Sequence, residues 1–238
     1  MTNWWFKERR PTMVDHDEPI VRRYLHYDWS RLMDAPIERV RFVVFDCETS
    51  GLDVRQDQML SLSAVGIHGG AISLGDRLDV LFRREDTGGA VAAQIHGILP
   101  RDLADGDDVQ SAVLSFLSFC RGAVLVGHHV AFDVAMIEAV TEALWNVRLQ
   151  NPRLDTAHLY QRVTSAAGSG QELDQAVSLD ALLGTYGITS RGRHSASGDA
   201  YATALLLVRL LHLAGRRGLW TARQMGVARA ARHSPNLA

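Results

Sequence analysis

Residues 41–48 read Arg-Phe-Val-Val-Phe-Asp-Cys-Glu, a short apolar run that ends in two acidic residues. Such a run is typical of a strand that is buried on both faces at the centre of a sheet. Side chains two positions apart on a strand share a face, so we expect Asp46 and Glu48 to lie together, with Cys47 pointing into the opposite, apolar layer. Carboxylates at the emerging end of a core strand are well explained as ligands of a hard divalent cation. A solvated strand end is the simpler alternative.

The chain on either side of this run predicts a single α/β domain. Met59–His68 and Ala71–Phe82 alternate in polarity around Gly69-Gly70, which is typical of a hairpin. Buried strands are expected at 123–127 and near Leu154, and helical spacing is found at 109–120, 132–144 and 201–213. Strands that alternate with helices after a meander predict a five-stranded mixed sheet, first antiparallel and then parallel, flanked by helices.

Three regions are expected along the chain. Residues 1–40 are predicted to be an N-terminal helical extension, with a helix that starts at Asp17-Glu18-Pro19. That helix would pack on the domain itself or, as an alternative, form a dimer contact. Residues 41–215 form the predicted domain, and residues 216–238 form a basic tail with five arginines and no acid. A tail of this kind is usually disordered, and contact with nucleic acid is the alternative.

Composition excludes several classes of protein. The chain has 238 residues, 25 Lys+Arg, 27 Asp+Glu and 47% hydrophobic residues, and its formal net charge is −2. These figures are unlike those of a disordered chain or a strongly basic DNA coat protein. Two cysteines, Cys47 and Cys120, are too few for a disulfide framework or a zinc ribbon and fit a reducing compartment. We expect a cytoplasmic protein without a signal peptide or membrane span.

Two further acids stand at the ends of predicted elements. Asp133 follows the 123–127 strand, and Asp199 precedes the last apolar helix. Taken singly, each of these acids is more often a helix cap or a surface residue. Together with Asp46 and Glu48, and on this order of elements, they indicate one site at the carboxyl ends of the strands, where open α/β sheets place their ligands.

The three acidic segments resemble the motifs of a known family. Residues 45–52 (Phe-Asp-Cys-Glu-Thr-Ser-Gly-Leu), 128–133 (His-His-Val-Ala-Phe-Asp) and 194–199 (His-Ser-Ala-Ser-Gly-Asp) are similar to the three exonuclease motifs of the DEDD superfamily. The histidine five residues before the last aspartate marks the DEDDh, or DnaQ-like, branch. That branch includes the proofreading epsilon subunit of bacterial DNA polymerase III and ribonuclease T. The similarity extends over residues 40–213.

The resemblance implies a ribonuclease H-like fold and a metal-dependent 3′–5′ exonuclease that releases nucleoside 5′-monophosphates. Two divalent cations, Mg²⁺ or Mn²⁺, about 4 Å apart would serve the attacking and leaving oxygens. Asp46, Glu48, Asp133 and Asp199 are the implied metal ligands. His194 is the implied general base, a role that suits histidine near neutral pH.

The same resemblance implies a pocket for the terminal nucleotide, formed by Thr49, Gly51, Leu52, His96 and Phe132. One departure is His129, where the family usually has asparagine, and it concerns the hydrogen bonds around the substrate strand. The neighbouring His128 and His129 also raise the question of zinc. We expect no zinc site there, because adjacent histidine rings should point apart and no cysteine pair joins them.

Several alternatives stay open at this stage. Single-stranded 3′ ends of DNA, in proofreading or repair, are the favoured substrate, and RNA trimming is the alternative. A non-catalytic interaction module is disfavoured because no carboxylate of the set is missing. Association with DNA polymerase III components is open too. Residues 58–62 (Gln-Met-Leu-Ser-Leu) resemble a sliding-clamp peptide, but they fall within a predicted strand.

Overall fold

The computed structural model describes residues 17–85, 94, 96–165 and 177–230. The helices are α1 (Pro19–Leu25), α3 (Pro100–Ala104), α4 (Val109–Cys120), α5 (Ala131–Trp145), α6 (Thr156–Thr164), α7 (Leu179–Thr185) and α8 (Ala196–Arg216). Two short 3₁₀ helices are η1 (Trp29–Leu32) and η2 (Ile37–Arg39). The strands are β1 (Phe42–Thr49), β2 (Met59–His68), β3 (Ala71–Leu81), β4 (Val124–Gly127) and β5 (Arg153–Asp155).

The five strands form one mixed sheet in the order β3-β2-β1-β4-β5. The strands β1, β2 and β3 pair antiparallel, whereas β4 and β5 continue the sheet parallel to β1. The predicted hairpin turn is present, because Gly69 and Gly70 both adopt positive φ, as the tight turn between β2 and β3 requires. This topology confirms the predicted meander followed by parallel strands.

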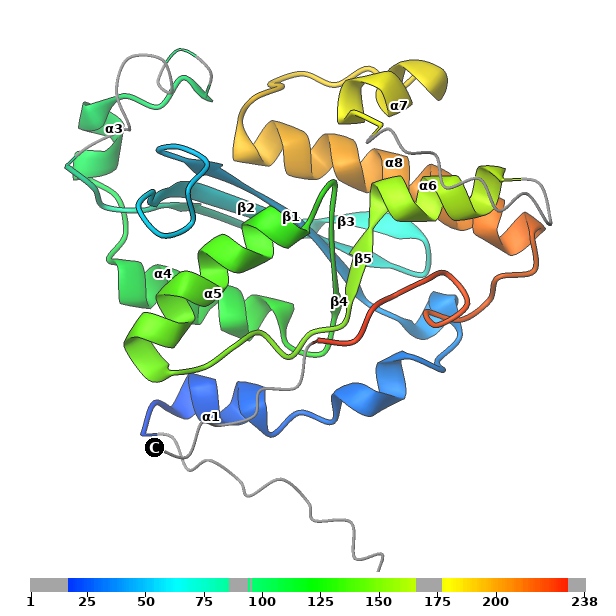
Figure 1. Cartoon of the computed structure of the whole chain (residues 1–238), viewed down its shortest axis with the longest axis horizontal. Helices are drawn as coiled ribbons and strands as arrows, with labels where there is room; N and C mark the ends of the chain where they lie inside the picture. The colour runs from blue at the N-terminus through cyan, green and yellow to red at the C-terminus, as the bar shows by residue number, and fades with distance from the viewer. Residues whose placement is uncertain (1–16, 86–93, 95, 166–176, 231–238) are drawn as a thin grey trace, which may run out of the picture.

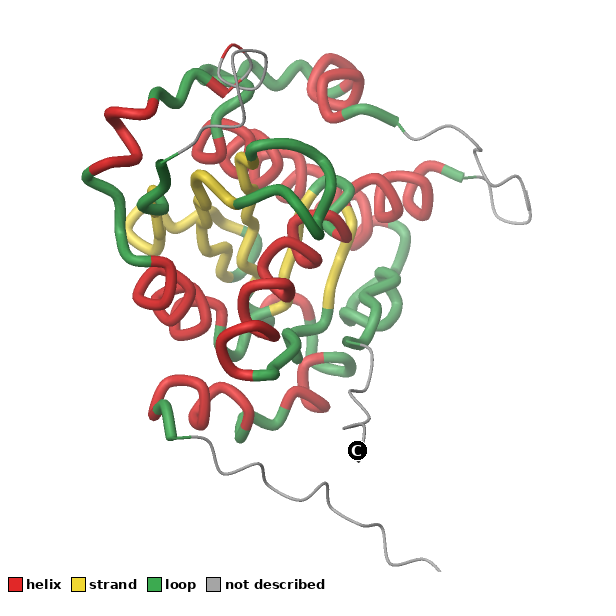
Figure 2. Tube along the Cα trace, turned by 60° about the vertical axis from the view of Figure 1, so that its left-hand side comes forward, coloured by secondary structure: helices red, strands yellow, loops and turns green. Residues whose placement is uncertain are grey.

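Helices cover both faces of the sheet, as Figures 1 and 2 show. Phe42 and Val44 of β1 pack with α6, α7 and α8 on one face. Val43 and Phe45 pack with α4 and α5 on the other. Alternate residues of the central strand therefore enter different apolar layers, which is why residues 42–45 read as a continuous apolar run.

The N-terminal segment packs on the domain itself. Helix α1 begins at the predicted position, where the Glu18 carboxylate accepts a hydrogen bond from the Ile20 N–H at 3.1 Å. The helix ends at Leu25, and the chain continues through η1 instead of as one long helix. Val21, Leu32 and Met33 are buried against the domain, as the simpler expectation required. Residues 1–16 of the predicted extension lie outside the described residues.

The segment after α8 differs from the expected disordered tail. Ala222, Met225 and Val227 are buried in the same apolar layer as α8. Arg153 and Ala228 exchange backbone hydrogen bonds of 2.8 Å in each direction. Residues 219–230 are thus part of the folded unit, and 231–238 lie outside the described residues. The apolar residues of 219–230 follow neither a helical nor a strand period, so pattern analysis does not identify this segment.

None of the helices in the described part of the chain combines the length and apolar character needed to cross a membrane. The longest of them, α8, carries Arg209 and His212 within its apolar stretch.

Candidate active site

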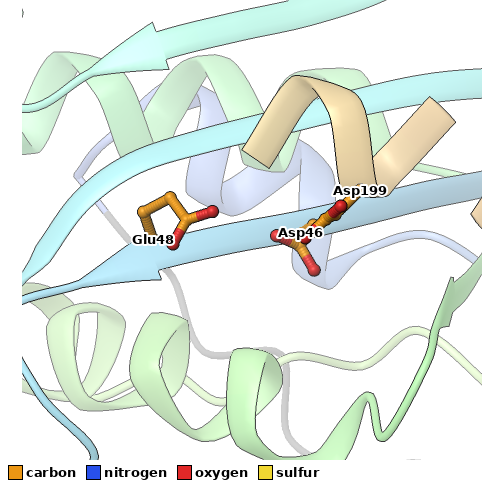
Figure 3. Close-up of side chains that lie close together, drawn as sticks. All are labelled: Asp46, Glu48 and Asp199. Carbon is orange, nitrogen blue, oxygen red and sulfur yellow. The ribbon is translucent and has the colours of Figure 1, made fainter. Parts of the chain in front are cut away.

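Three carboxylates meet at the carboxyl end of the central strand. Asp46 and Glu48 project from β1, and Asp199 projects toward them from the first turn of α8 (Figure 3). One oxygen from each residue lies within 4.8 Å of the others. Because hard divalent cations take oxygen ligands, this donor set fits Mg²⁺ or Mn²⁺. Within the described part of the chain, no other group of three or more potential ligands has this spacing.

The local fold explains why these side chains converge. Strand β1 continues past its apolar run to Thr49, so Asp46 and Glu48 stand on the strand itself. Both side chains lie on the face of the sheet that is covered by α8. Phe42 and Val44, earlier in the same strand, lie on that face too. The pairing of β1 with β2 changes register between Glu48 and Thr49, which ends the regular ladder beside the carboxylates.

Asp133 approaches from the opposite face of the sheet. It is buried in the first turn of α5, and its Oδ1 accepts a hydrogen bond from the Cys47 N–H at 3.1 Å. Asp133 therefore holds the backbone of β1 between the two strand carboxylates, and it stands outside the three-residue group. The prediction that Asp133 assists in metal binding stays a prediction.

Burial and repulsion disfavour the charged forms of these acids. Burial, together with the charges of Asp133 and Glu48, raises the pKa of Asp46 well above its ordinary value. Burial also raises the pKa of Glu48 to about 6 and that of Asp133 to about 7. A set of acids that is this costly to ionise without a counterion is what a cation site requires.

Arg193 lies in the cluster and was missed at the sequence level. Its guanidinium pairs with the Asp199 carboxylate, and its Nε donates to Asp180 Oδ1 at 2.7 Å. Its charge also lowers the pKa of Asp46 and Glu48, against the effect of burial. Arg193 is thus a cation of the chain itself at the place where the acids need one.

The loop that carries Arg193 and His194 is held close to α8. A Cβ on Gly198 would lie 1.8 Å from the Gly192 carbonyl oxygen, so only glycine permits this approach. The His194 N–H donates to Asp199 Oδ2 at 3.2 Å, and His194 has a φ of 63°, which is rare for a residue other than glycine. His194 is exposed beside Asp199.

The end of β1 and the turn after it carry three of the predicted nucleotide-binding residues. The Thr49 hydroxyl donates to the Gly51 carbonyl at 2.7 Å, and Leu52 is 83% exposed. Asp57 orders this turn by accepting hydrogen bonds from the Ser50 hydroxyl and the Asp53 N–H. A Cβ at Gly51 would lie 2.5 Å from Asp57 Oδ2, so a side chain there would displace the carboxylate that orders the turn.

The other two predicted nucleotide-binding residues come from separate segments. His96 is buried ahead of α3, and its Nδ1 accepts from the Ile98 N–H at 3.0 Å. Phe132 is half-buried at the start of α5 and packs with the apolar layer that contains Cys47. Their predicted contact with a nucleotide stays a prediction.

The histidine pair corrects one expectation. The rings of His128 and His129 do not point apart but meet edge to face, with centroids 4.4 Å apart, because His129 adopts a φ of 61°. His128 is held by Thr156 Oγ1 at 2.9 Å and by the Val177 carbonyl at 2.8 Å. Both ring nitrogens of His128 are therefore engaged within the protein.

Comparison with protein families gives a decisive match. The RNase T family model, described as "Exonuclease", matches residues 43–207, which include all three acidic motifs. The chain belongs to this exonuclease family. Its mixed five-stranded sheet is the ribonuclease H-like fold of such DEDD-type exonucleases, and the chain thus carries an exonuclease domain.

The chain has relatives that are named as DNA polymerase III proteins. It is 35% identical over 195 residues to a "DNA polymerase III subunit epsilon-like protein" of Rhodobacter capsulatus. It is 28% identical over 208 residues to "DNA polymerase III PolC-type" of Bacillus subtilis. These alignments span 81% and 87% of this chain, but only 27% and 13% of the relatives.

Solved structures share the fold at low sequence identity. E. coli Exonuclease I in complex with a dT13 oligonucleotide gives a TM-score of 0.61 at 19% identity, over 76% of this chain and 43% of that chain. Exonuclease X in complex with 5′ overhanging duplex DNA gives a TM-score of 0.56 at 23% identity, over 78% of this chain and 96% of that chain.

Proposed function

We propose that this exonuclease domain hydrolyses nucleic acid from the 3′ end and releases nucleoside 5′-monophosphates. The observation that carries the proposal is the Asp46–Glu48–Asp199 cluster at the end of β1, in a chain of the exonuclease family. Two divalent cations, Mg²⁺ or Mn²⁺, would supply Lewis-acid stabilisation of the charge that develops at phosphorus. Asp46, Glu48 and Asp199 would hold them, with Asp133 in support.

The protein's own groups take the remaining roles. His194 accepts the proton of the attacking water, for which its exposed position beside Asp199 leaves it accessible. Thr49, Gly51 and the exposed Leu52 place the terminal nucleotide, with Leu52 wedged against its base. His96 and Phe132 complete that pocket.

Single-stranded DNA is the proposed substrate, in proofreading or repair. Support comes from relatives named as DNA polymerase III proteins and from structural neighbours solved with DNA. RNA trimming is the competing activity within the same site chemistry. The clamp-peptide resemblance of residues 58–62 gives no support for polymerase binding, since Met59–Leu62 are buried within β2. We therefore propose a stand-alone or loosely associated cytoplasmic enzyme.

The test uses 5′-labelled DNA and RNA oligonucleotides of the same sequence with Mg²⁺, Mn²⁺ or EDTA. We expect a ladder that shortens from the 3′ end with either metal, faster on DNA, and no shortening in EDTA. Metal-dependent cleavage of RNA alone would replace DNA with RNA as the substrate. If neither oligonucleotide is shortened with either metal, the proposed function is wrong.

Asp46→Asn gives the matching prediction for the site. It removes one ligand charge without changing side-chain size, and we expect the rate to fall about a thousandfold, because metal ligation supplies several kcal/mol of transition-state stabilisation. Asp79→Asn, at an exposed acid on the edge strand β3, is the control and should retain full activity. Circular dichroism should give wild-type spectra for both variants.

A further inference from the structure

A second basic feature stands beside the candidate active site. A cleft of about 890 Å³ opens between the start of β2, the end of β3 and α3. The described residues that line it are Gln58, Arg83, Arg84, Glu85, Pro100 and Ala104. Among these described residues, two arginines and one glutamate give a positive balance, in a chain whose total charge is −2.

Arg84 is a half-buried cation that pairs with none of the described acids. Its Nε donates to the Met59 carbonyl at 3.2 Å, and its guanidinium lies 5.7 Å from the centre of the Phe82 ring. Burial lowers its pKa, and none of the carboxylates that the structure describes forms an ion pair with it. Desolvating a guanidinium without a carboxylate partner is costly, so an anion bound at Arg84 would stabilise this placement.

Arg83, at the rim of the cleft, also favours the binding of an anion there. Its side chain is exposed, while its backbone N–H donates to the Asp107 carbonyl at 2.8 Å and fixes the end of β3. Glu85 is also exposed and is the one acid among the described residues that line the cleft. The planar guanidinium of Arg84 presents a fork of N–H donors, and Arg83 is a second arginine beside it. Such an arrangement matches the oxygen atoms of a phosphate group.

The cleft is one strand away from the carboxylate cluster. Met59, which accepts the Arg84 hydrogen bond, pairs with Thr49 in the sheet. Gln58 accepts a hydrogen bond from the Ser50 N–H at 2.9 Å and so joins the cleft to the turn after β1. Neighbouring strands lie about 4.8 Å apart, so an anion held by Arg84 would be close to a nucleotide bound at Thr49.

We propose that this cleft binds a phosphodiester group of the nucleic acid substrate, with Arg84 as the main ligand and Arg83 as the second. The proposal rests on the proposed function, since it names how that substrate is held. The phosphate comes either from the strand that is degraded or, in a duplex, from the complementary strand. Phosphate contacts of this kind position the chain without reading its sequence.

The test measures binding separately from cleavage. Fluorescence anisotropy with Ca²⁺ in place of Mg²⁺ gives the affinity for single-stranded oligonucleotides of increasing length and for a duplex with a recessed end. Arg84→Gln should weaken binding about tenfold, as expected for a lost charged hydrogen bond. It should also reduce the slope of log affinity against log salt by about 0.7 on single strands. Arg84→Lys should recover part of the affinity, and Arg83→Gln should give a smaller loss.

Arg77→Gln is the matched control. Arg77 is an exposed arginine on β3 outside the cleft, and its loss changes the net charge equally. It should leave the affinity and salt slope unchanged. Thermal melts identify any variant that fails to fold, in which case Arg83→Gln and Arg84→Lys carry the test.

The outcomes separate the two proposals. A loss of affinity on single strands assigns the cleft to the degraded strand, and a loss on duplexes alone assigns it to the complementary strand. Wild-type affinity in the arginine variants on every substrate would overturn the cleft proposal, whether or not the enzyme cleaves. If wild type binds oligonucleotides but shortens none of them, the proposed function fails while the binding comparison still decides the cleft.

Discussion

Arg193 shows what a single side chain does to the chemistry of this site. Its guanidinium bridges Asp199 and Asp180, and its charge offsets part of the repulsion around Asp46 and Glu48. A divalent cation that enters the same cluster must compete with this positive charge for the carboxylates. Arg193 thus lowers the cost of holding the acids together in the metal-free protein.

Arg193→Gln therefore should bind Mg²⁺ several-fold more tightly than wild type, because the competing charge is gone. Isothermal titration calorimetry at fixed pH measures this directly and does not depend on activity. Arg191→Gln, at an exposed arginine two residues away, should bind Mg²⁺ as wild type does. Unchanged or weaker binding by the Arg193 variant would show that the guanidinium supports the metal instead of competing with it.

Sequence patterns identify the acids of this site better than its basic groups. Asp46 and Glu48 are predictable because strand alternation places i and i+2 on one face. Arg193 is not, because its contact with Asp199 depends on a loop folded back through the Gly192–Gly198 approach, which has no periodic signal. The His128–His129 ring contact depends in the same way on one positive φ.

At the scale of elements, one acid positions the start of two helices. Asp155 ends β5, and its Oδ1 accepts from the Ala157 N–H at 2.9 Å, which caps α6. Its Oδ2 accepts from the Val130 N–H at 3.1 Å, at the start of α5. Asp133 lies in the first turn of α5, so Asp155 helps to set where Asp133 meets β1.

Asp155→Ala therefore should reduce both stability and exonuclease activity. Loss of the helix cap costs about 1 kcal/mol in the free energy of unfolding. The control is Asp108→Ala, which removes the cap of α4, where Asp108 Oδ2 accepts from the Ser111 N–H at 3.2 Å. We expect both variants to be destabilised in urea and only Asp155→Ala to lose activity. Equal activity in the two variants would remove Asp155 from the positioning of Asp133.

Element boundaries followed from local patterns where the pattern was strong. The strand predicted at 59–68 matches β2. The strand predicted from residues 41–48 matches β1, which runs from Phe42 to Thr49. Residues 219–230 fold through tertiary contacts of Ala222, Met225 and Val227, which single-sequence periodicity does not report.

At the scale of the whole molecule, the buried acids couple folding to pH and metal. Glu48 and Asp133 have ordinary pKa values of 4.5 and 3.8, and in the folded protein these rise to about 6 and about 7. At pH values between the ordinary and the folded pKa of each group, the folded state holds protons that the unfolded state has lost. The free energy of unfolding therefore falls as pH rises through this range. His128 acts in the opposite direction, because burial lowers its pKa.

The melting temperature of the metal-free enzyme in EDTA should therefore fall between pH 4 and pH 7. The fall should be complete above the pKa values that Glu48 and Asp133 have in the folded protein. Mg²⁺ binds the ionised carboxylates, so its stabilisation should grow with pH and offset the loss at pH 8. Asp133→Asn can keep the hydrogen bond from the Cys47 N–H. It should flatten the dependence of melting temperature on pH in EDTA, because Asp133, whose pKa is raised further than that of Glu48, no longer titrates. Differential scanning calorimetry across this range measures both effects. A melting temperature in EDTA that rises steadily from pH 4 to pH 7 would mean that the acids are ionised in the metal-free fold, with Arg193 as a sufficient counterion.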